Sequence, residues 1–278
     1  MSIEKPLPLM VGNKAYYSLT SYDPVEITVE VPYTSEEEVA YALEMTVGDM
    51  GGTPADLDDP AWLAAHFEGR NTRAEVREAM RQELRTMNAQ MAEQQKLGKC
   101  VEALTERLAQ SVPAEHIAQA KEAIQARFTQ QLQAEGLTPS QFIARSGTSP
   151  DQLEAMFDRQ ARQMAEGDAA LSAYAHEKKL KVDEHEYERL LGLPAEDLKT
   201  VMDQARAVGQ LDELREAALR SKAAQIVVAE CSCTYEHETP EHARVRMLQY
   251  RQMKEMYDQN FGADSDEGEE EKTGFKLV

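Results

Sequence analysis

Near the N-terminus, apolar and polar residues alternate in a way typical of a β-strand. From 25 to 31 the sequence reads Val-Glu-Ile-Thr-Val-Glu-Val, with an aliphatic side chain at every second position. This is the period of a strand with one buried face. Pro32 follows, and proline cannot continue a central strand. Because an isolated strand is not stable, the sequence predicts a pairing partner, for which the neighbouring segment 16–20 is the best local candidate.

A helical pattern begins directly after this strand. Ser35 and Glu38 have the spacing of a capping box, in which each side chain accepts a hydrogen bond from a backbone N–H of the other's residue. The apolar side of the predicted short helix consists of Val39, Leu43 and Met45. Residues 48–60 are then rich in Gly, Pro and Asp, which indicates a linker. We place a domain boundary there.

Helical periodicity dominates the rest of the chain. Thr72 and Glu75 form a second capping-box pattern, which opens a predicted helix over 73–110 that Gly98 bends without ending. Its apolar stripe consists of Val76, Met80, Leu84, Met87, Met91, Leu97, Val101, Leu104 and Leu108. Further helices are predicted over 114–135, from Thr138-Pro139, over 150–179, from Asp183, over 195–207, from Leu211 to near Cys231, and over 240–260.

These patterns predict a mainly α fold. Only 6% of the residues are aromatic, and the predicted helices over 114–135 and 150–175 contain many alanines, which bury little area per residue. We therefore expect an extended multi-helix body with arms, a small N-terminal strand–helix element, and a disordered acidic tail over 262–278.

The charge distribution excludes some partners. The chain of 278 residues carries a formal net charge of −20, which disfavours broad contact with nucleic acid. Residues 1–60 hold 12 acidic and 2 basic side chains, and residues 262–278 hold 6 and 2, so the part between is close to neutral for its length. With three cysteines, no long apolar run and no visible export signal, the sequence predicts a cytoplasmic protein that does not span a membrane.

No residue pattern indicates a catalytic or metal site. Cys231 and Cys233 have His237 and His242 nearby, but a single residue between two cysteines is a poor spacing for zinc. Cys100 lies in the middle of a predicted helix with no histidine close in sequence. The six histidines form no ligand motif, and the paired carboxylates at 36–38 and 58–59 suit caps and linkers better than acid–base chemistry. We assign no catalytic and no metal-ligating residue.

The middle of the chain resembles a known family. Residues 57–62 (Leu-Asp-Asp-Pro-Ala-Trp) and 72–84 (Thr-Arg-Ala-Glu-Val-Arg-Glu-Ala-Met-Arg-Gln-Glu-Leu) resemble the entry to the C-terminal domain of bacterial trigger factor. The resemblance continues in order through Val112-Pro113, Gln141-Phe142, 154–165, 167–180 and 214–230, and covers 57–236. It implies a chaperone with a two-armed helical cradle that binds unfolded or nascent polypeptides without a cofactor.

The sequence also departs from the pattern of this family. Residues 22–39 look like the strand and helix that precede the peptidyl-prolyl isomerase domain in trigger factor, yet here they lead straight into the C-terminal domain. No counterpart of the isomerase domain or of the ribosome-docking domain is visible, so the resemblance carries over neither isomerase chemistry nor ribosome binding. Two alternatives stay open, an isomerase of the full trigger factor type and an assembly factor for one protein partner; a homodimer is also compatible with an exposed cradle.

The predicted organisation has four parts: a strand–helix element (1–56), a trigger-factor-like helical domain (57–236), an additional helix (237–261) and the tail (262–278). Flexible methionine re-packs against varied partners, which suits a surface for many clients, and large flexible or aromatic side chains occur at positions where alanine could have closed the packing. The client-contact residues we expect on this ground are Met87, Met91, Phe128, Phe142, Phe157 and Met164.

Overall fold

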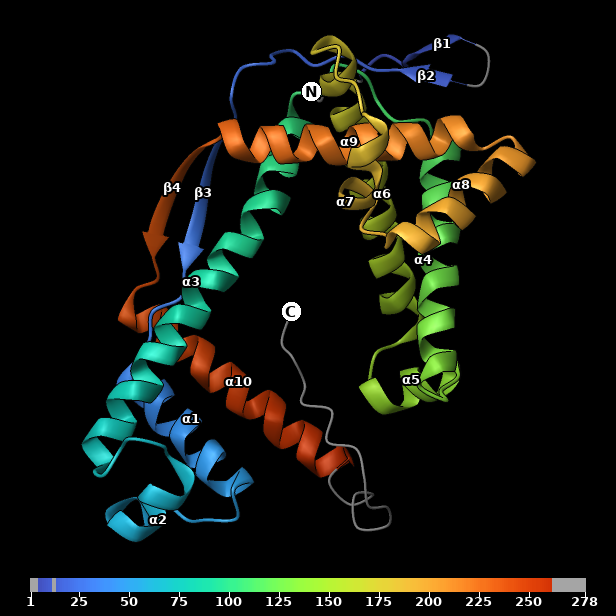
Figure 1. Ribbon diagram of the computed structural model, residues 1–278. Helices are drawn as coiled ribbons and strands as arrows, with labels where there is room; N and C mark the ends of the chain where they lie inside the picture. The colour runs from blue at the N-terminus through green and yellow to red at the C-terminus, as the bar shows by residue number, and fades with distance from the viewer. Residues whose placement is uncertain (1–4, 12–13, 262–278) are drawn as a thin grey trace. The chain divides into compact units, whose positions relative to one another are not determined.

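The protein is mainly α-helical, as the sequence predicts (Figure 1). A computed structural model describes residues 5–11 and 14–261, so the predicted acidic tail lies outside the described residues. The helices are α1 (Glu36–Asp49), α2 (Pro60–His66), α3 (Arg73–Glu106), α4 (Ala114–Ala134), α5 (Pro139–Ser146), α6 (Pro150–Glu177), α7 (Tyr187–Leu191), α8 (Ala195–Val208), α9 (Leu211–Glu230) and α10 (Pro240–Phe261). Two 3₁₀ turns, η1 (Asp56–Asp58) and η2 (Glu184–Glu186), precede α2 and α7.

The predicted capping boxes are present and explain where helices start. The Glu38 N–H donates to Ser35 Oγ over 3.0 Å, and both reciprocal bonds form at this cap. The Thr72 and Glu75 pair at the start of α3 is also reciprocal. Ser149 caps α6 in the same way, with Pro150 in the first turn. Helix α3 passes through Gly98 without a break.

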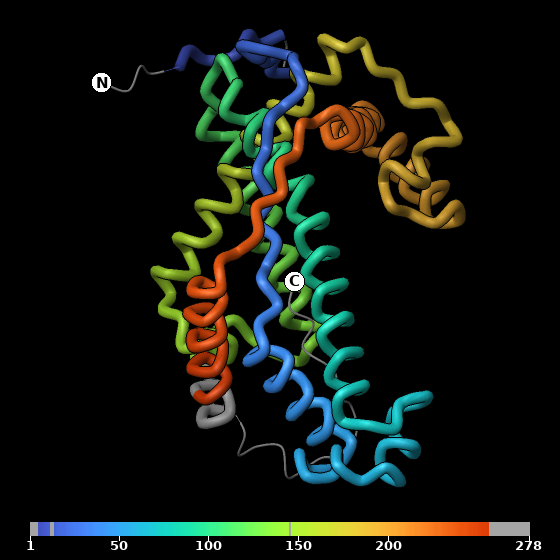
Figure 2. Tube along the Cα trace, turned by 90° about the vertical axis from the view of Figure 1, so that its left-hand side faces the viewer, coloured from blue at the N-terminus to red at the C-terminus, as the bar shows by residue number. Residues whose placement is uncertain are grey.

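The strands differ from the prediction in one important respect. The predicted strand is β3 (Glu26–Val31), but its neighbour is β4 (Ser232–His237) and not segment 16–20. The Ser232 N–H donates to the Val25 carbonyl over 2.9 Å, and both strands run in the same direction (Figure 1). The turned view in Figure 2 also shows these two segments side by side. Parallel strands need a long connection, so a strand parallel to β3 has to come from a distant part of the sequence.

Segment 16–20 has other partners. Tyr16 ends β2 (Lys14–Tyr16), which pairs antiparallel with β1 (Leu9–Val11). Beyond it, the Thr20 N–H donates to the Arg107 carbonyl over 2.8 Å and the Ala109 N–H to the Ser18 carbonyl over 2.9 Å. The N-terminal segment therefore runs beside the end of α3.

The described residues group into two compact units. The first contains those of Met1–Val31, Ala89–Pro139 and Ser149–Glu236, and the second those of Pro32–Asn88, Ser140–Thr148 and His237–Val278. One hydrophobic cluster of the second unit joins Leu43 and Val47 to Leu57 and Leu63, so residues on both sides of the expected boundary at 48–60 share a core. The four-part division of the chain stays a prediction.

The core of the first unit combines β3 with small residues of helices. Val25 and Val29 are buried, and α6 packs on α9 through alanines that include Ala170 and Ala223. Gly167 of α6 lies so close to α3 that an added Cβ would be 2.9 Å from Val101 Cγ1. Small side chains thus bring these helices into close contact.

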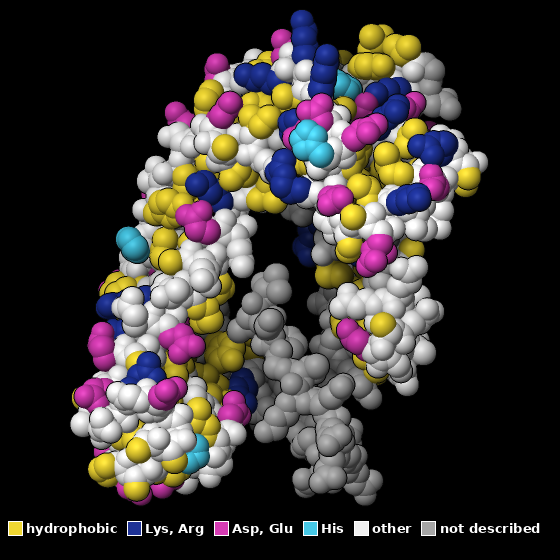
Figure 3. Space-filling model, in the orientation of Figure 1, with side chains coloured by type: hydrophobic (Ala, Val, Ile, Leu, Met, Phe, Trp, Pro, Cys, Tyr) yellow, Lys and Arg dark blue, Asp and Glu magenta, His cyan; other side chains and the backbone are white. Residues whose placement is uncertain are grey.

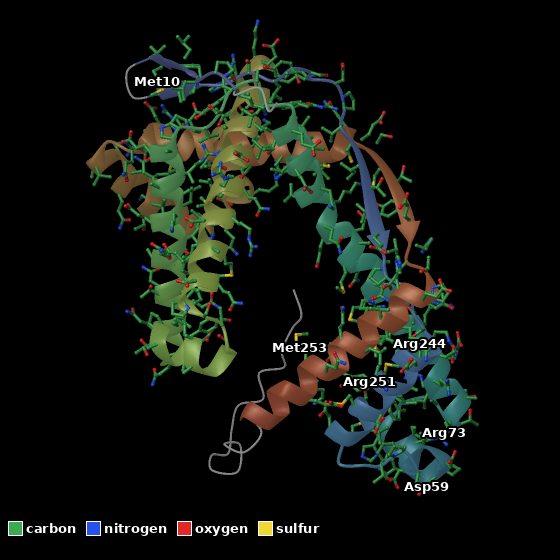
Figure 4. All side chains as sticks on the ribbon, turned by 180° about the vertical axis from the view of Figure 1, so that it is seen from behind. Met10, Asp59, Arg73, Arg244, Arg251 and Met253 are labelled. Carbon is green, nitrogen blue, oxygen red and sulfur yellow. The ribbon has the colours of Figure 1, made fainter. Side chains whose placement is uncertain are left out.

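The second unit joins α1, α2, the start of α3 and α10. Arg246 of α10 donates to Glu38 of α1 over 3.1 Å and to Glu238 over 3.1 Å, and its Nη2 also donates to the Tyr33 carbonyl. Both carboxylates are nearly buried. A second ion pair joins Arg251 to Glu37. In Figure 4 the labelled Arg244, Arg251 and Met253 follow one another along α10. The additional C-terminal helix is therefore attached to α1 by these ion pairs.

Two glycine substitutions should change stability in opposite directions. Gly167→Ala places its Cβ against Val101, whose β-branched side chain is stiff in a helix, so we expect a net loss of about 1 kcal/mol. Gly98→Ala has nothing within 4 Å of the new Cβ and should gain about 0.5–1 kcal/mol from helix propensity. Urea unfolding of both variants measures the difference, and an equal effect of both would contradict the close approach of α6 to α3.

Removing the cation between Glu38 and Glu238 should destabilise the second unit. We expect Arg246→Met to lower the unfolding free energy by about 2–3 kcal/mol, less than for a fully buried pair because the Arg246 side chain is 37% exposed. Arg244→Met, at an exposed position of the same helix, is the control and should change stability little. Urea unfolding and amide exchange of α10 provide the measurement, and equal behaviour of the two variants would show that the ion pairs do not hold α10.

Candidate functional site

The first unit contains an open cleft of about 940 Å³ beside the C-terminal half of α3. Its walls come from α3, from the connection to α4, from α6 and from the N-terminal segment. The lining residues are Lys5, Gly98, Val101, Glu102, Thr105, Glu106, Leu108, Gln110, Ser111, Val112, Gln163, Met164 and Glu166.

Hydrogen bonds of the backbone and of two side chains hold the N-terminal wall in place. The Ser111 N–H donates to the Pro6 carbonyl over 2.9 Å, and the Ser111 hydroxyl donates to the Lys5 carbonyl over 3.2 Å. Farther along, the Ser18 N–H donates to Gln110 Oε1 over 2.8 Å. The segment before β1 is thus fixed to the connection between α3 and α4.

The chemistry of the cleft suits binding of a flexible ligand. Val101, Val112 and Met164 offer apolar contact, and the charged lining residues are three glutamates and one lysine. No histidine, cysteine or tyrosine is among the lining residues, so the cleft has no imidazole that could activate its hydroxyl groups as a general base. Within the described residues, no group of three His, Cys, Asp or Glu side chains could hold a metal ion.

The structure separates the six residues expected to contact clients. Met164 is 44% exposed and lines the cleft. Met91 and Phe128 are half-buried in the first unit. Phe157 is buried, and its ring meets Phe128 edge-on with centroids 5.4 Å apart. Phe157 therefore fills the contact between α4 and α6. Because the ring is buried, the structure gives no support for its role in client contact.

The remaining two residues belong to the second unit. Met87 is 45% exposed near the end of this unit's part of α3, and Phe142 of α5 is half-buried. The six residues thus do not form one surface within either unit. Met164 is the one that the described cleft includes.

Sequence reasoning missed an apolar surface on the β1–β2 hairpin. Leu7, Leu9, Met10 and Val11 are all exposed, from 48% at Met10 to 71% at Leu7. Figure 3 shows hydrophobic side chains gathered over this hairpin, and Figure 4 places Met10 on it. The Gly-Asn dipeptide at 12–13 after an apolar run is a sequence signal of a hairpin and could have revealed it. In the second unit, Val245, Leu248 and Met253 of α10 are similarly exposed.

An ionic cluster attaches the hairpin to the helices of the first unit. Lys14 of β2 pairs with Glu216 of α9, and His176 Nε2 lies 3.3 Å from a Glu216 carboxylate oxygen. The Tyr16 and His176 rings are 6.0 Å apart. Burial pushes the pKa of Glu216 upward, but Lys14 and His176 together outweigh it and hold this pKa below its ordinary value.

The fold and the cleft define the class: a mainly α-helical protein with an open, partly apolar cleft. A family model described as the bacterial trigger factor protein (TF) C-terminus matches residues 72–229, more than half of the chain. The protein belongs to this family, and its membership supports a function as a chaperone of the trigger factor type. The match is to the C-terminal domain and not to an isomerase domain. A search of curated proteins found no match. Among the described residues, no helix has both the length and the apolarity to cross a membrane.

The lowered pKa of Glu216 predicts how the hairpin attachment depends on pH. Because the pKa in the folded protein is below the ordinary value of 4.5, the stabilisation is complete above that value and is lost as pH falls through the folded pKa. Glu216→Gln should therefore cost roughly 1 kcal/mol at pH 7, and its difference from the wild type should shrink as the solution becomes more acidic. The measurement is urea unfolding over a series of pH values. Glu213→Gln, at an exposed position on the same helix, is the control, and a pH-independent Glu216→Gln difference would contradict the assignment.

Proposed function

We propose that this protein is a chaperone that holds unfolded or nascent polypeptides in the cleft of its first unit, without a cofactor. The observation that carries the proposal is that an exposed methionine lies in an open cleft of a trigger factor family member. A client segment in this cleft would contact Val101, Val112 and Met164, and the glutamates at its rim would stay hydrated.

Several features support weak binding of many unfolded clients rather than tight recognition of one partner. The cleft is open and offers a flexible methionine, which adapts to varied apolar side chains at small energetic cost. Exposed apolar residues of the hairpin belong to the same unit and would add contact area for an extended client. Weak contacts of this kind release quickly, so a client can fold after it dissociates.

The two competing functions, prolyl isomerisation and assembly of one partner, require other kinds of binding site. Prolyl isomerisation requires an enclosed pocket that fixes one proline, whereas the lining of this cleft is open and contains no aromatic side chain. A dedicated assembly factor would bind one folded partner in preference to denatured proteins. We propose a non-enzymatic, general chaperone, and faster prolyl isomerisation of a short peptide in its presence would overturn the non-enzymatic part.

The client-binding role of Met164 can be tested by substitution. Met164→Ser removes a partly exposed apolar side chain from the cleft, which should weaken binding of a denatured client about fivefold, corresponding to about 1 kcal/mol of lost apolar burial. Fluorescence anisotropy with a labelled, permanently unfolded client measures the affinity. Light scattering of a client diluted from denaturant measures the delay of aggregation, which should shorten in parallel.

Two further variants complete the experiment. Val208→Ser changes a residue that is 67% exposed on α8 of the same unit but does not line the cleft, and it should bind clients as the wild type does. Met164→Leu should restore most of the affinity because apolar area is retained. If Met164→Ser and Val208→Ser bind equally well, the cleft is not the client site.

A further inference from the structure

The three cysteines of this chain come together in the first unit although they are far apart in sequence. Cys100 lies in α3, Cys231 follows the last residue of α9, and Cys233 lies in β4. Cys100 is fully buried in the main hydrophobic core, and the other two are half-buried against the same core. All the cysteines that the sequence contains therefore share one location.

The contacts within the cluster distinguish the two cysteines of the β4 region. All three belong to one hydrophobic cluster. After burial, the Cys231 thiol is the neighbour that most raises the pKa of Cys100, and Cys233 acts on Cys100 more weakly. Cys231 Sγ also lies 3.2 Å from the Val228 carbonyl oxygen. Cys233 instead helps to raise the pKa of Tyr235, after the hydrogen bond that the Tyr235 hydroxyl donates to Glu93. Cys231 is thus the direct neighbour of the buried thiol.

We propose that Cys100 and Cys231 form a reversible disulfide site that joins α3 to the junction of α9 and β4. The pairing of β3 with β4 and the packing of α9 bring the two thiols together in the reduced protein, so the bond closes without unfolding of the unit. Cys233 remains a free thiol in the oxidised form.

The competing bond between Cys231 and Cys233 is disfavoured by the extended backbone. Cys231 has φ −63° and ψ 146°, and Cys233 lies within β4. Side chains two residues apart on a strand point to the same side with their Cβ atoms about 6.5 Å apart, whereas a disulfide requires about 3.5–4.5 Å. That bond would require β4 to bend away from β3.

Exposure sets the order of the chemical steps. Burial is the main cause that raises the pKa of the Cys100 thiol to about 12, so this thiol is a poor first attacker. The half-buried Cys231 thiolate attacks a small organic disulfide, forms a mixed disulfide and expels one thiolate, which takes up a proton. Cys100 then attacks the Cys231 sulfur, gives up its proton and expels the second thiolate. Two protein thiols are oxidised and one organic disulfide is reduced to two thiols.

The test uses the full chain and hydroxyethyl disulfide, a small neutral oxidant that the net charge of −20 does not repel. After oxidation, titration should find one free thiol where the reduced protein has three, and peptide mapping should find Cys100 linked to Cys231. Because the bond constrains a long segment of the unfolded chain, the thermal midpoint should rise on the order of 10 °C and return on reduction.

Alanine variants separate the proposed bond from its competitors. Cys233→Ala should still form the intramolecular bond, whereas Cys231→Ala and Cys100→Ala should not, and alanine avoids an unpaired hydroxyl at the buried position. Cys231→Ala changes a half-buried residue, so it tests the proposal even if Cys100→Ala fails to fold. Three free thiols after oxidation, a bond between Cys231 and Cys233, or cross-linking between molecules as the main product would each overturn the proposal.

Discussion

Close contact between helices at small side chains is the constraint on which the first unit depends. Gly167 leaves room for Val101 of α3, and buried alanines of α6 lie against Ala223 of α9. Such contacts gain dispersion energy from tight packing but remove little apolar area from water per residue. Large apolar side chains such as Met164 therefore need not complete the core and can remain at the surface. An open cleft beside α3 is a physical consequence of this kind of core.

The second constraint is the pairing of β3 with β4, which are far apart in the sequence. A parallel pair joins residues far apart in sequence, so β3 and β4 depend on the core of the first unit, to which α3, α6 and α9 contribute residues. This arrangement also brings Cys231 to Cys100. The trigger factor family match ends at residue 229, just before β4, so β4 and α10 extend the protein beyond the matched segment while remaining part of its two compact units.

Local signals predicted much of the helical structure. Capping boxes such as Ser35–Glu38 and Thr72–Glu75 depend on residues three apart and form as expected, and the periodicity of α3 continues through Gly98. The strand β4 was missed because a six-residue segment with mixed polarity has no strong period of its own. The candidate site was predicted only in part. Flexible methionine suggested both Met164 and Met87, but periodicity does not distinguish a residue at a cleft from one on a convex surface or, as for Phe157, in the interior.

The sequence by itself determined the mainly α fold, the starts of most helices, the alternation of β3 and the resemblance to trigger factor, because each depends on residues that are close together in the chain. The tertiary structure alone decided the partner of β3, the burial of Phe157, the cleft around Met164 and the meeting of the three cysteines. These features depend on which side chains meet after helices pack, and that outcome follows from the shapes of distant surfaces rather than from any local pattern.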